Sequence, residues 1–135
     1  MMAASEPDLV TDTNLMGVTR EFVRREPSFH HSEFGTTRAD FECMVTSDFS
    51  EIGASGRKYS RDDVLDELEK RHSSPHEDKW QARDFYCRQL APNNYLLNSA
   101  LVQDDVRVTH RTTIWRSTPD GWKVAFHQGT LVEFG

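Results

Sequence analysis

The chain has 135 residues, with 16 Lys or Arg and 22 Asp or Glu, so its formal net charge is -6 at pH 7. An acidic chain with scattered basic residues argues against nucleic acid and anionic membrane surfaces as partners, and no run approaches the roughly 20 apolar residues of a membrane span. The length predicts one domain over residues 8–135, preceded by disordered residues 1–7. No signal-peptide pattern is present, and two cysteines, Cys43 and Cys87, are typical of a reducing compartment, so we expect a cytoplasmic protein.

The first predicted helix covers residues 8–25. Its apolar side chains Leu15, Val18 and Phe22 recur at the spacing of one helix face. Pro27 ends the helix, because the residue before a proline avoids the helical region of backbone conformation.

Two further helices are expected before the long strands. Thr37 followed by Asp40 resembles a capping box, which predicts a short helix that ends at residues 47–48. Ser60 is a good N-cap residue, so a third helix is expected from there to about His72.

After Pro75 the apolar spacing changes from about 3.6 residues to about 2, which is typical of strands. The four long strands are expected at residues 80–90, 95–103, 106–117 and 122–134, with short extended pieces at 49–54 and 58–59. Helices first and an antiparallel meander afterwards predict an α+β fold, with the helices on one face of a curved sheet.

The last two strands are joined by a Pro-Asp-Gly turn, and regular pairing from this turn fixes their partners. It places Arg111 opposite Gln128 and Thr113 opposite Phe126, on the face that also carries Trp115. That face is apolar near the turn and polar at its far end, as expected for the wall of a small-molecule pocket.

Arg111 is the first candidate for a ligand anchor, with Gln128 beside it. A partly dehydrated guanidinium needs an anionic or carbonyl partner, and its planar shape suits carboxylates. The alternative is an internal salt bridge, to Asp48 or Glu51, that orders the sheet. Thr113, Trp115, Phe126 and Tyr59 are candidates for the pocket wall, with plain core packing as the alternative.

Asp48 and Glu51 are the acids nearest the expected pocket mouth. Either is a candidate general base if burial raises its pKa, although Asp48 is equally suited to bonding backbone groups at a helix end. No set of Cys and His has the spacing of a zinc site, so we expect neither a metal nor a cofactor.

Two sequence segments resemble those of a known family: SDFSEIGASGRKYSRDDVL at residues 47–65 and TTIWRSTPDGWKVAFHQGT at residues 112–130. They resemble the nuclear-transport-factor-2-like superfamily, in its bacterial branch near the SnoaL-like polyketide cyclases and ketosteroid isomerases. Over roughly residues 10–134, the resemblance implies a cone: a strongly bent, mostly antiparallel six-stranded sheet around three N-terminal helices, with a pocket inside.

The resemblance also implies a homodimer through the outer face of the sheet, where the pattern places Thr112, Arg116 and His127. It assigns the acid-base position of the related enzymes to Gly53, which cannot take a proton, and the pocket-facing positions of the last strand to Phe126 and Gln128.

Three functional hypotheses follow. The first is a small-molecule-binding domain without chemistry, for a partly apolar, anionic organic ligand. The second is a cofactor-independent isomerase, cyclase or hydrolase, with Glu51 or Asp48 as base and with Arg111 and Gln128 holding an oxyanion. The third is a structural or partner-binding dimer module, which would be favoured by a cavity below roughly 100 Å³.

Overall fold

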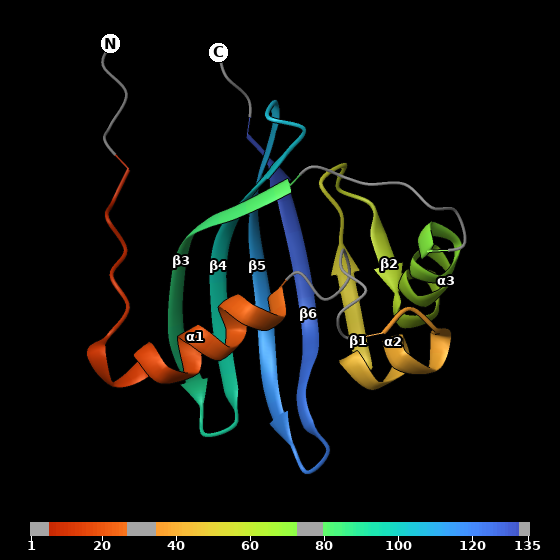
Figure 1. Cartoon of the computed structure of the whole chain (residues 1–135), viewed down its shortest axis with the longest axis horizontal. Coiled ribbons are helices and arrows are strands. Elements are labelled where there is room, and N and C mark those ends of the chain that lie inside the picture. Colours follow the sequence, from red (N-terminus) through yellow and green to blue (C-terminus); the bar gives the residue numbers. More distant parts are fainter. Residues whose placement is uncertain (1–5, 27–34, 73–79, 133–135) are drawn as a thin grey trace.

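The computed structural model describes residues 6–26, 35–72 and 80–132 (Figure 1). Its elements are η1 (Thr13–Leu15), α1 (Met16–Arg25), α2 (Arg38–Met44), β1 (Val45–Ile52), β2 (Lys58–Ser60), α3 (Arg61–His72), β3 (Trp80–Ala91), β4 (Asn94–Gln103), β5 (Arg107–Thr118) and β6 (Gly121–Leu131). The strands form one six-stranded sheet in the order β2-β1-β6-β5-β4-β3, which is not closed. The expected α+β class is therefore confirmed.

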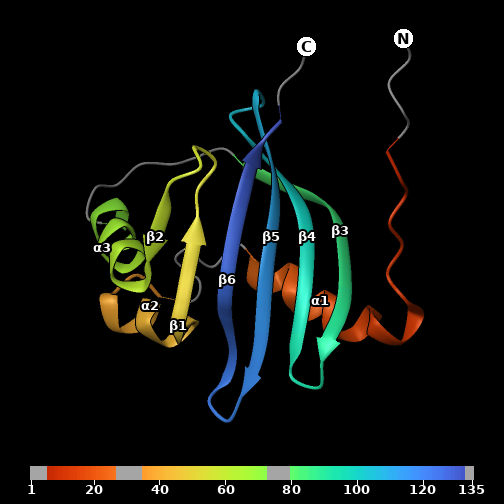
Figure 2. The same ribbon diagram turned by 180° about the vertical axis from the view of Figure 1, so that it is seen from behind.

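The sheet is mixed, because β1 runs parallel to β6 while the other neighbouring strands are antiparallel. Helix α1 crosses one face, as the views from the front and from behind show (Figures 1 and 2). We call this the helix-covered face, and the other, which no helix of the described residues covers, the open face. Helices α1 and α2 precede the first strand, whereas α3 follows the short strand β2 and precedes the four long strands.

The N-terminal helix begins later than expected, at Met16 rather than near residue 8. A single 3-10 turn precedes it, and the segment before that runs beside β3. There the hydroxyl of Thr11 accepts a hydrogen bond of 3.0 Å from the backbone N–H of Cys87. This contact with the edge strand holds the segment in an extended course instead of a helix.

The capping predictions were correct, whereas the end of α2 was not. Thr37 and Asp40 form a complete capping box, and Ser60 exchanges hydrogen bonds of 3.0 and 3.1 Å with Asp63 at the start of α3. The chain leaves α2 directly into β1 at Val45, so residues 47–48 lie in the strand. Pairing of Val45 with β6 extends the strand over these polar residues.

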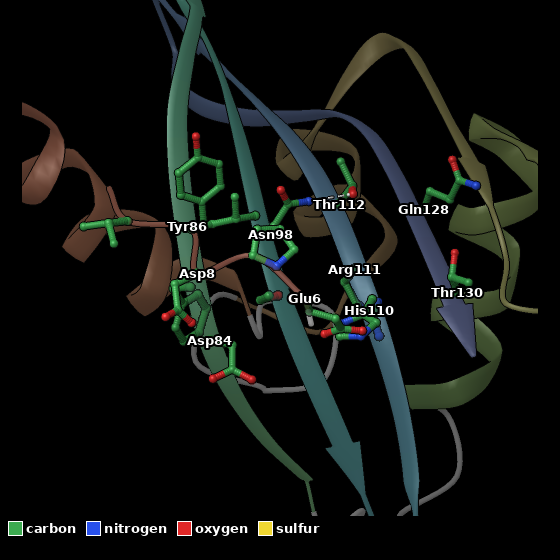
Figure 3. Close-up of a pocket in the computed structure, with 15 residues that line it drawn as sticks. Glu6, Asp8, Asp84, Tyr86, Asn98, His110, Arg111, Thr112, Gln128 and Thr130 are labelled. Carbon is green, nitrogen blue, oxygen red and sulfur yellow. Dashed lines mark hydrogen bonds between the residues drawn. The ribbon is translucent and has the colours of Figure 1, made fainter. Parts of the chain in front are cut away.

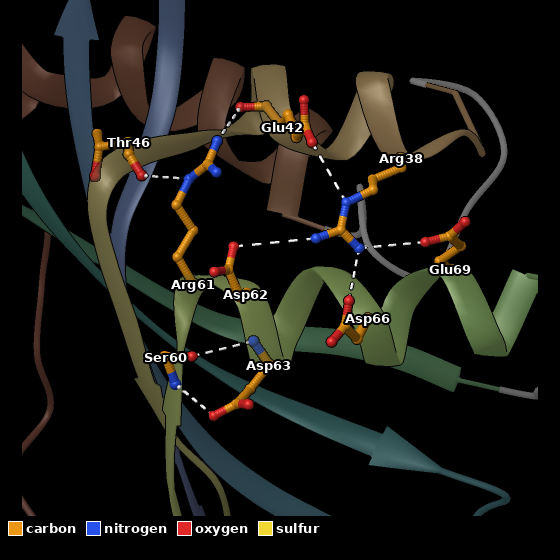
Figure 4. A network of polar contacts seen from close by, with 9 residues as sticks. All are labelled: Arg38, Glu42, Thr46, Ser60, Arg61, Asp62, Asp63, Asp66 and Glu69. Carbon is orange, nitrogen blue, oxygen red and sulfur yellow. Dashed lines mark hydrogen bonds and ion pairs between the residues drawn. The ribbon is translucent and has the colours of Figure 1, made fainter.

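Helices α2 and α3 are joined by Arg38, which contacts Glu42, Asp62, Asp66 and Glu69 (Figure 4). These pairs are solvent-exposed and contribute little to stability individually. Arg61 adds hydrogen bonds of 3.2 Å to the backbone carbonyls of Thr46 and Glu42. Together these contacts hold α2 and α3 against the start of β1.

The core lies between the helices and the helix-covered face. It contains Phe22, Phe41, Val45, Phe49, Val64, Leu65, Leu68, Cys87, Leu97, Trp115 and Val124. Phe22 is fully buried and contacts three aromatic rings of the sheet, those of Tyr95, Trp115 and Trp122. The apolar stripe of α1 is thus fixed across β4, β5 and β6.

A β-bulge in the closing hairpin changes which side chains face the core. Trp115 pairs with Val124 as expected, but Ile114 pairs with Phe126 and Thr113 with His127, so Ala125 is an extra residue in β6. Because side chains alternate along a strand, one inserted residue turns all later side chains to the opposite face. The expected shared face of Arg111, Phe126 and Gln128 was therefore wrong.

Candidate functional site

A chain of hydrogen-bonded polar side chains lies on the helix-covered face. Nε of Arg111 donates to Nε2 of His127 over 2.9 Å, and Nδ1 of the same ring lies 2.8 Å from Oε1 of Glu51. These residues come from β5, β6 and β1, and Glu51 and His127 are direct partners in the parallel ladder. His127 was expected on the outer face, and the bulge at Ala125 is the reason that it points inward instead.

This chain is largely removed from water. The side chain of His127 is 7% exposed and that of Glu51 is 22% exposed. Burial would raise the pKa of Glu51, but the hydrogen bond with His127, the charge of that ring when it is protonated, and the charges of Arg111 and Arg71 outweigh it, so the pKa lies below its usual value. Glu51 is therefore ionised at neutral pH and is a weaker base than an ordinary carboxylate.

Arg111 is flanked by carboxylates that it does not contact directly. Burial lowers the pKa of its guanidinium, while the charges of Glu26 and Glu51 oppose that change, and an arginine remains charged in proteins. Within the described residues it forms no direct ion pair with Asp48 or Glu51, the two salt-bridge partners considered from the sequence. Its one hydrogen bond to a described side chain uses Nε, which leaves both terminal amino groups available.

Glu26, the residue that follows α1, is a functional-site neighbour that the sequence reasoning missed. Its Oε1 accepts a hydrogen bond of 2.6 Å from the hydroxyl of Thr113, and its Oε2 accepts one of 3.1 Å from the indole nitrogen of Trp115. Glu26 lies four residues after the buried Phe22, so the helical spacing of the apolar stripe was the signal that indicated its inward direction.

The polar chain borders a hollow of about 160 Å³ between α3 and the helix-covered face. The volume is below the roughly 300–1,000 Å³ that is usual for drug-sized ligands, so it suits a compact molecule. Three arginines, two glutamates and one glutamine line it, with two apolar side chains: Arg71, Arg107, Arg111, Glu51, Glu67, Gln103, Val64 and Leu68. Its charged groups sum to a net positive charge, since three cations face two anions.

A wider hollow of about 910 Å³ lies over the open face, between residues 6–10 and the sheet (Figure 3). Its floor is a row of polar side chains across four strands, formed by Tyr86, Asn98, Thr112 and Gln128. All five of the flanking residues 6–10 are exposed. Three carboxylates, those of Glu6, Asp8 and Asp84, also line this hollow, and Arg111 lines both hollows.

The other predicted site residues do not line the hollow beside Arg111. Asp48 is exposed and bonds Thr46 and Arg116, which hold the pKa of its carboxyl below the usual value. Thr113 and Trp115 are buried on the helix-covered face. Tyr59 pairs with Glu51 in the antiparallel ladder and packs against the core.

Gly53 follows the end of β1 and lies one strand pleat beyond Glu51. A Cβ at this position would come within 3.0 Å of the Tyr59 ring, so the packing favours a residue without a side chain there.

Within residues 6–26, 35–72 and 80–132, no three His, Cys, Asp or Glu side chains are grouped so that they could hold a metal ion. Among the helices of those same ranges, none has the length and apolar character needed to cross a membrane.

At the level of sequence, no protein-family model and no curated protein matches the chain. Solved structures do match, and they define its class: the fold is that of the cystatin-like, nuclear-transport-factor-2-like proteins. An uncharacterised protein with a cystatin-like fold from Caulobacter vibrioides has a TM-score of 0.68 and 15% identity, covering 87% of this chain and 92% of that one.

Two more solved structures with this fold have similar TM-scores. A nuclear-transport-factor-2-like protein of unknown function in nutrient uptake, from Rhodospirillum rubrum, has a TM-score of 0.64 at 15% identity and covers 87% of this chain and 98% of that one. A candidate ketosteroid isomerase from Parabacteroides distasonis has a TM-score of 0.67 at 17% identity, covering 93% and 96%. Identities this low establish the shared fold alone.

Proposed function

We propose that the protein binds a small organic anion, of the size of a short carboxylic acid, in the hollow beside Arg111. The observation that carries the proposal is the guanidinium of Arg111: His127 holds it through Nε, and Arg111 lines the hollow. Arginine donates two parallel hydrogen bonds to a carboxylate. Val64 and Leu68 supply an apolar wall for the rest of the molecule.

Binding without chemistry fits this site better than acid-base catalysis. A general base works best when its pKa lies near the working pH, whereas the pKa of Glu51 is lowered by its neighbours. Asp48, the other candidate base, is exposed and bonded to Arg116 outside the hollow. We therefore assign Glu51 to holding His127, and Arg111 to holding the ligand.

The first test compares small acids with neutral molecules of the same shape. Propionate and benzoate are expected to raise the melting temperature of the protein, while propionamide and benzamide leave it unchanged. In Arg111→Gln the dissociation constant of the acid is expected to rise by about two orders of magnitude, because charged hydrogen bonds worth roughly 1.5–3 kcal/mol each are lost. Calorimetric titration measures this change.

Arg116→Gln is the matched control, because it removes the same charge from β5 on the open face. Equal binding of acids and amides, or unchanged binding in Arg111→Gln, would refute the proposal.

A cofactor-independent enzyme remains the second candidate, since Glu51 has one oxygen that is not bonded to His127. The fold neighbour from Parabacteroides distasonis, a candidate ketosteroid isomerase, is compatible with such chemistry. Chemical conversion of a bound acid, followed by NMR over hours, would favour this function over simple binding.

We also propose a cytoplasmic homodimer that associates through the open face. Leu96, Ile114 and Phe126 are cross-strand partners there, and all three are partly exposed. An apolar row on a sheet face without a covering element favours association with a second copy. The two cysteines are unpaired, which fits the reducing compartment.

Light scattering is expected to give twice the 15.6 kDa mass of the chain, and Ile114→Asp is expected to give a folded monomer. Val106→Asp, at a side chain that is 78% exposed in the β4–β5 turn, should leave the mass unchanged. A monomeric parent protein at high concentration would contradict the homodimer.

A further inference from the structure

The ring of His127 lies between a group that can only donate a hydrogen bond and a group that can only accept one. Arg111 has no acceptor atom, so the Nε2 that faces its Nε–H must carry a lone pair. Ionised Glu51 has no donor, so the Nδ1 that faces it must carry the proton. The two hydrogen bonds therefore require a neutral imidazole that is protonated on Nδ1.

We infer that His127 is a positioning residue, whose neutral form fixes Arg111 for an anionic ligand and whose protonation releases it. The inference rests on the function proposed above, since it concerns the same anchor. It adds that acid pH regulates ligand binding through His127, a residue that does not line the hollow.

The charged groups around the ring determine where an added proton goes. Glu51 on β1 faces Nδ1, and Arg111 on β5 faces Nε2. Farther out, Glu26 at the end of α1 acts on Arg111, and Arg71 on α3 acts on Glu51.

The lowered pKa of Glu51 keeps that carboxylate ionised as the pH falls, so an added proton goes to the ring. Nδ1 already carries a proton, so the second proton must occupy Nε2. Two N–H groups then oppose each other where one hydrogen bond had been. A charged ring is also placed beside the Arg111 guanidinium, and the guanidinium loses the contact that sets its orientation.

The test measures the affinity for ethanesulfonate between pH 8 and pH 5, because the charge of a sulfonate is constant in this range. For the wild type, the dissociation constant is expected to rise with acidification toward a limiting slope of about tenfold per pH unit, which is the linkage of one proton. His127→Gln is expected to bind at pH 7.5 and to keep its affinity at acid pH, because its amide accepts from Arg111 and donates to Glu51 without titrating.

His110→Gln, at an exposed histidine of the same strand as Arg111, should retain the full pH dependence. A wild-type affinity that is constant across the range would overturn the role of His127 while leaving the Arg111 anchor intact. Unchanged binding in Arg111→Gln would instead overturn the anchor itself.

A second measurement does not depend on the folding of the variant. Nitrogen-15 spectra of the wild-type histidines at pH 7.5 distinguish a protonated from an unprotonated ring nitrogen. The inference expects His127 to have a proton on Nδ1 and none on Nε2. A proton on Nε2 at that pH would overturn it.

Discussion

Replacing Phe22 with alanine is expected to lower the free energy of unfolding by about 3–5 kcal/mol, the usual range for a fully buried phenylalanine. The ring has no exposed surface. It stacks on Trp115 with a centroid distance of 5.4 Å and an interplanar angle of 11°, and meets Trp122 edge-on at 4.9 Å. The substitution removes the contacts that fix α1 across the sheet, and the large neighbouring rings cannot fill the cavity without leaving their own positions.

Denaturant unfolding of Phe22→Ala, followed by tryptophan fluorescence, measures the change. Val23→Ala is the matched control on the same helix, because Val23 is 38% exposed; it should cost no more than about 0.5 kcal/mol. Comparable losses in the two variants would mean that α1 is not held by the Phe22 contacts.

Glu26→Ala is expected to lower the free energy of unfolding by about 2–4 kcal/mol, even though it also removes a partly buried charge. The carboxylate is the partner of two sheet donors, the hydroxyl of Thr113 and the indole N–H of Trp115. A buried donor left without an acceptor costs roughly 1–3 kcal/mol. Arg111 also loses a nearby counter-charge. Chemical denaturation of the variant beside the parent protein gives the difference.

Glu26→Gln separates hydrogen bonding from charge, because the amide keeps one acceptor oxygen; a loss of about 1 kcal/mol is expected. A double-mutant cycle with Thr113→Val isolates the 2.6 Å contact, and the two losses should be clearly less than additive. Strict additivity would show that Glu26 and Thr113 do not interact.

Local rules were enough to predict most elements of this fold. The capping residues Thr37 and Ser60 correctly marked two helix starts, and the Pro-Asp-Gly turn correctly marked the β5–β6 hairpin. These signals depend on neighbours within four residues, so they can be read without knowing the tertiary structure. The predicted helix start near residue 8 failed because a distant partner, the backbone of Cys87, binds Thr11.

Which side chains face the candidate site depends on one residue, Ala125, that no local sequence pattern identifies. Ala125 forms the bulge, and the hydrophobic alternation before it gives no warning of an inserted residue. Arg111 and Glu51, two of the candidates chosen from the sequence, border one hollow. His127, which joins them, was assigned to the wrong face, and Gln128 was assigned to the inside for the same reason.

The parallel pairing of β1 with β6 has a consequence for the order in which the molecule folds. Strands β3 to β6 can form successive hairpins from neighbouring segments, whereas β1 reaches β6 only by closing a loop whose entropy cost grows with its length. Such non-local contacts are typically made late and slow the folding of the whole domain. Glu51 and His127 stand 76 residues apart in the chain. In a partly folded protein, the β3–β6 meander would therefore already contain Arg111 and His127. The carboxylate of Glu51 would join their hydrogen-bonded chain only when β1 pairs with β6 in the final step.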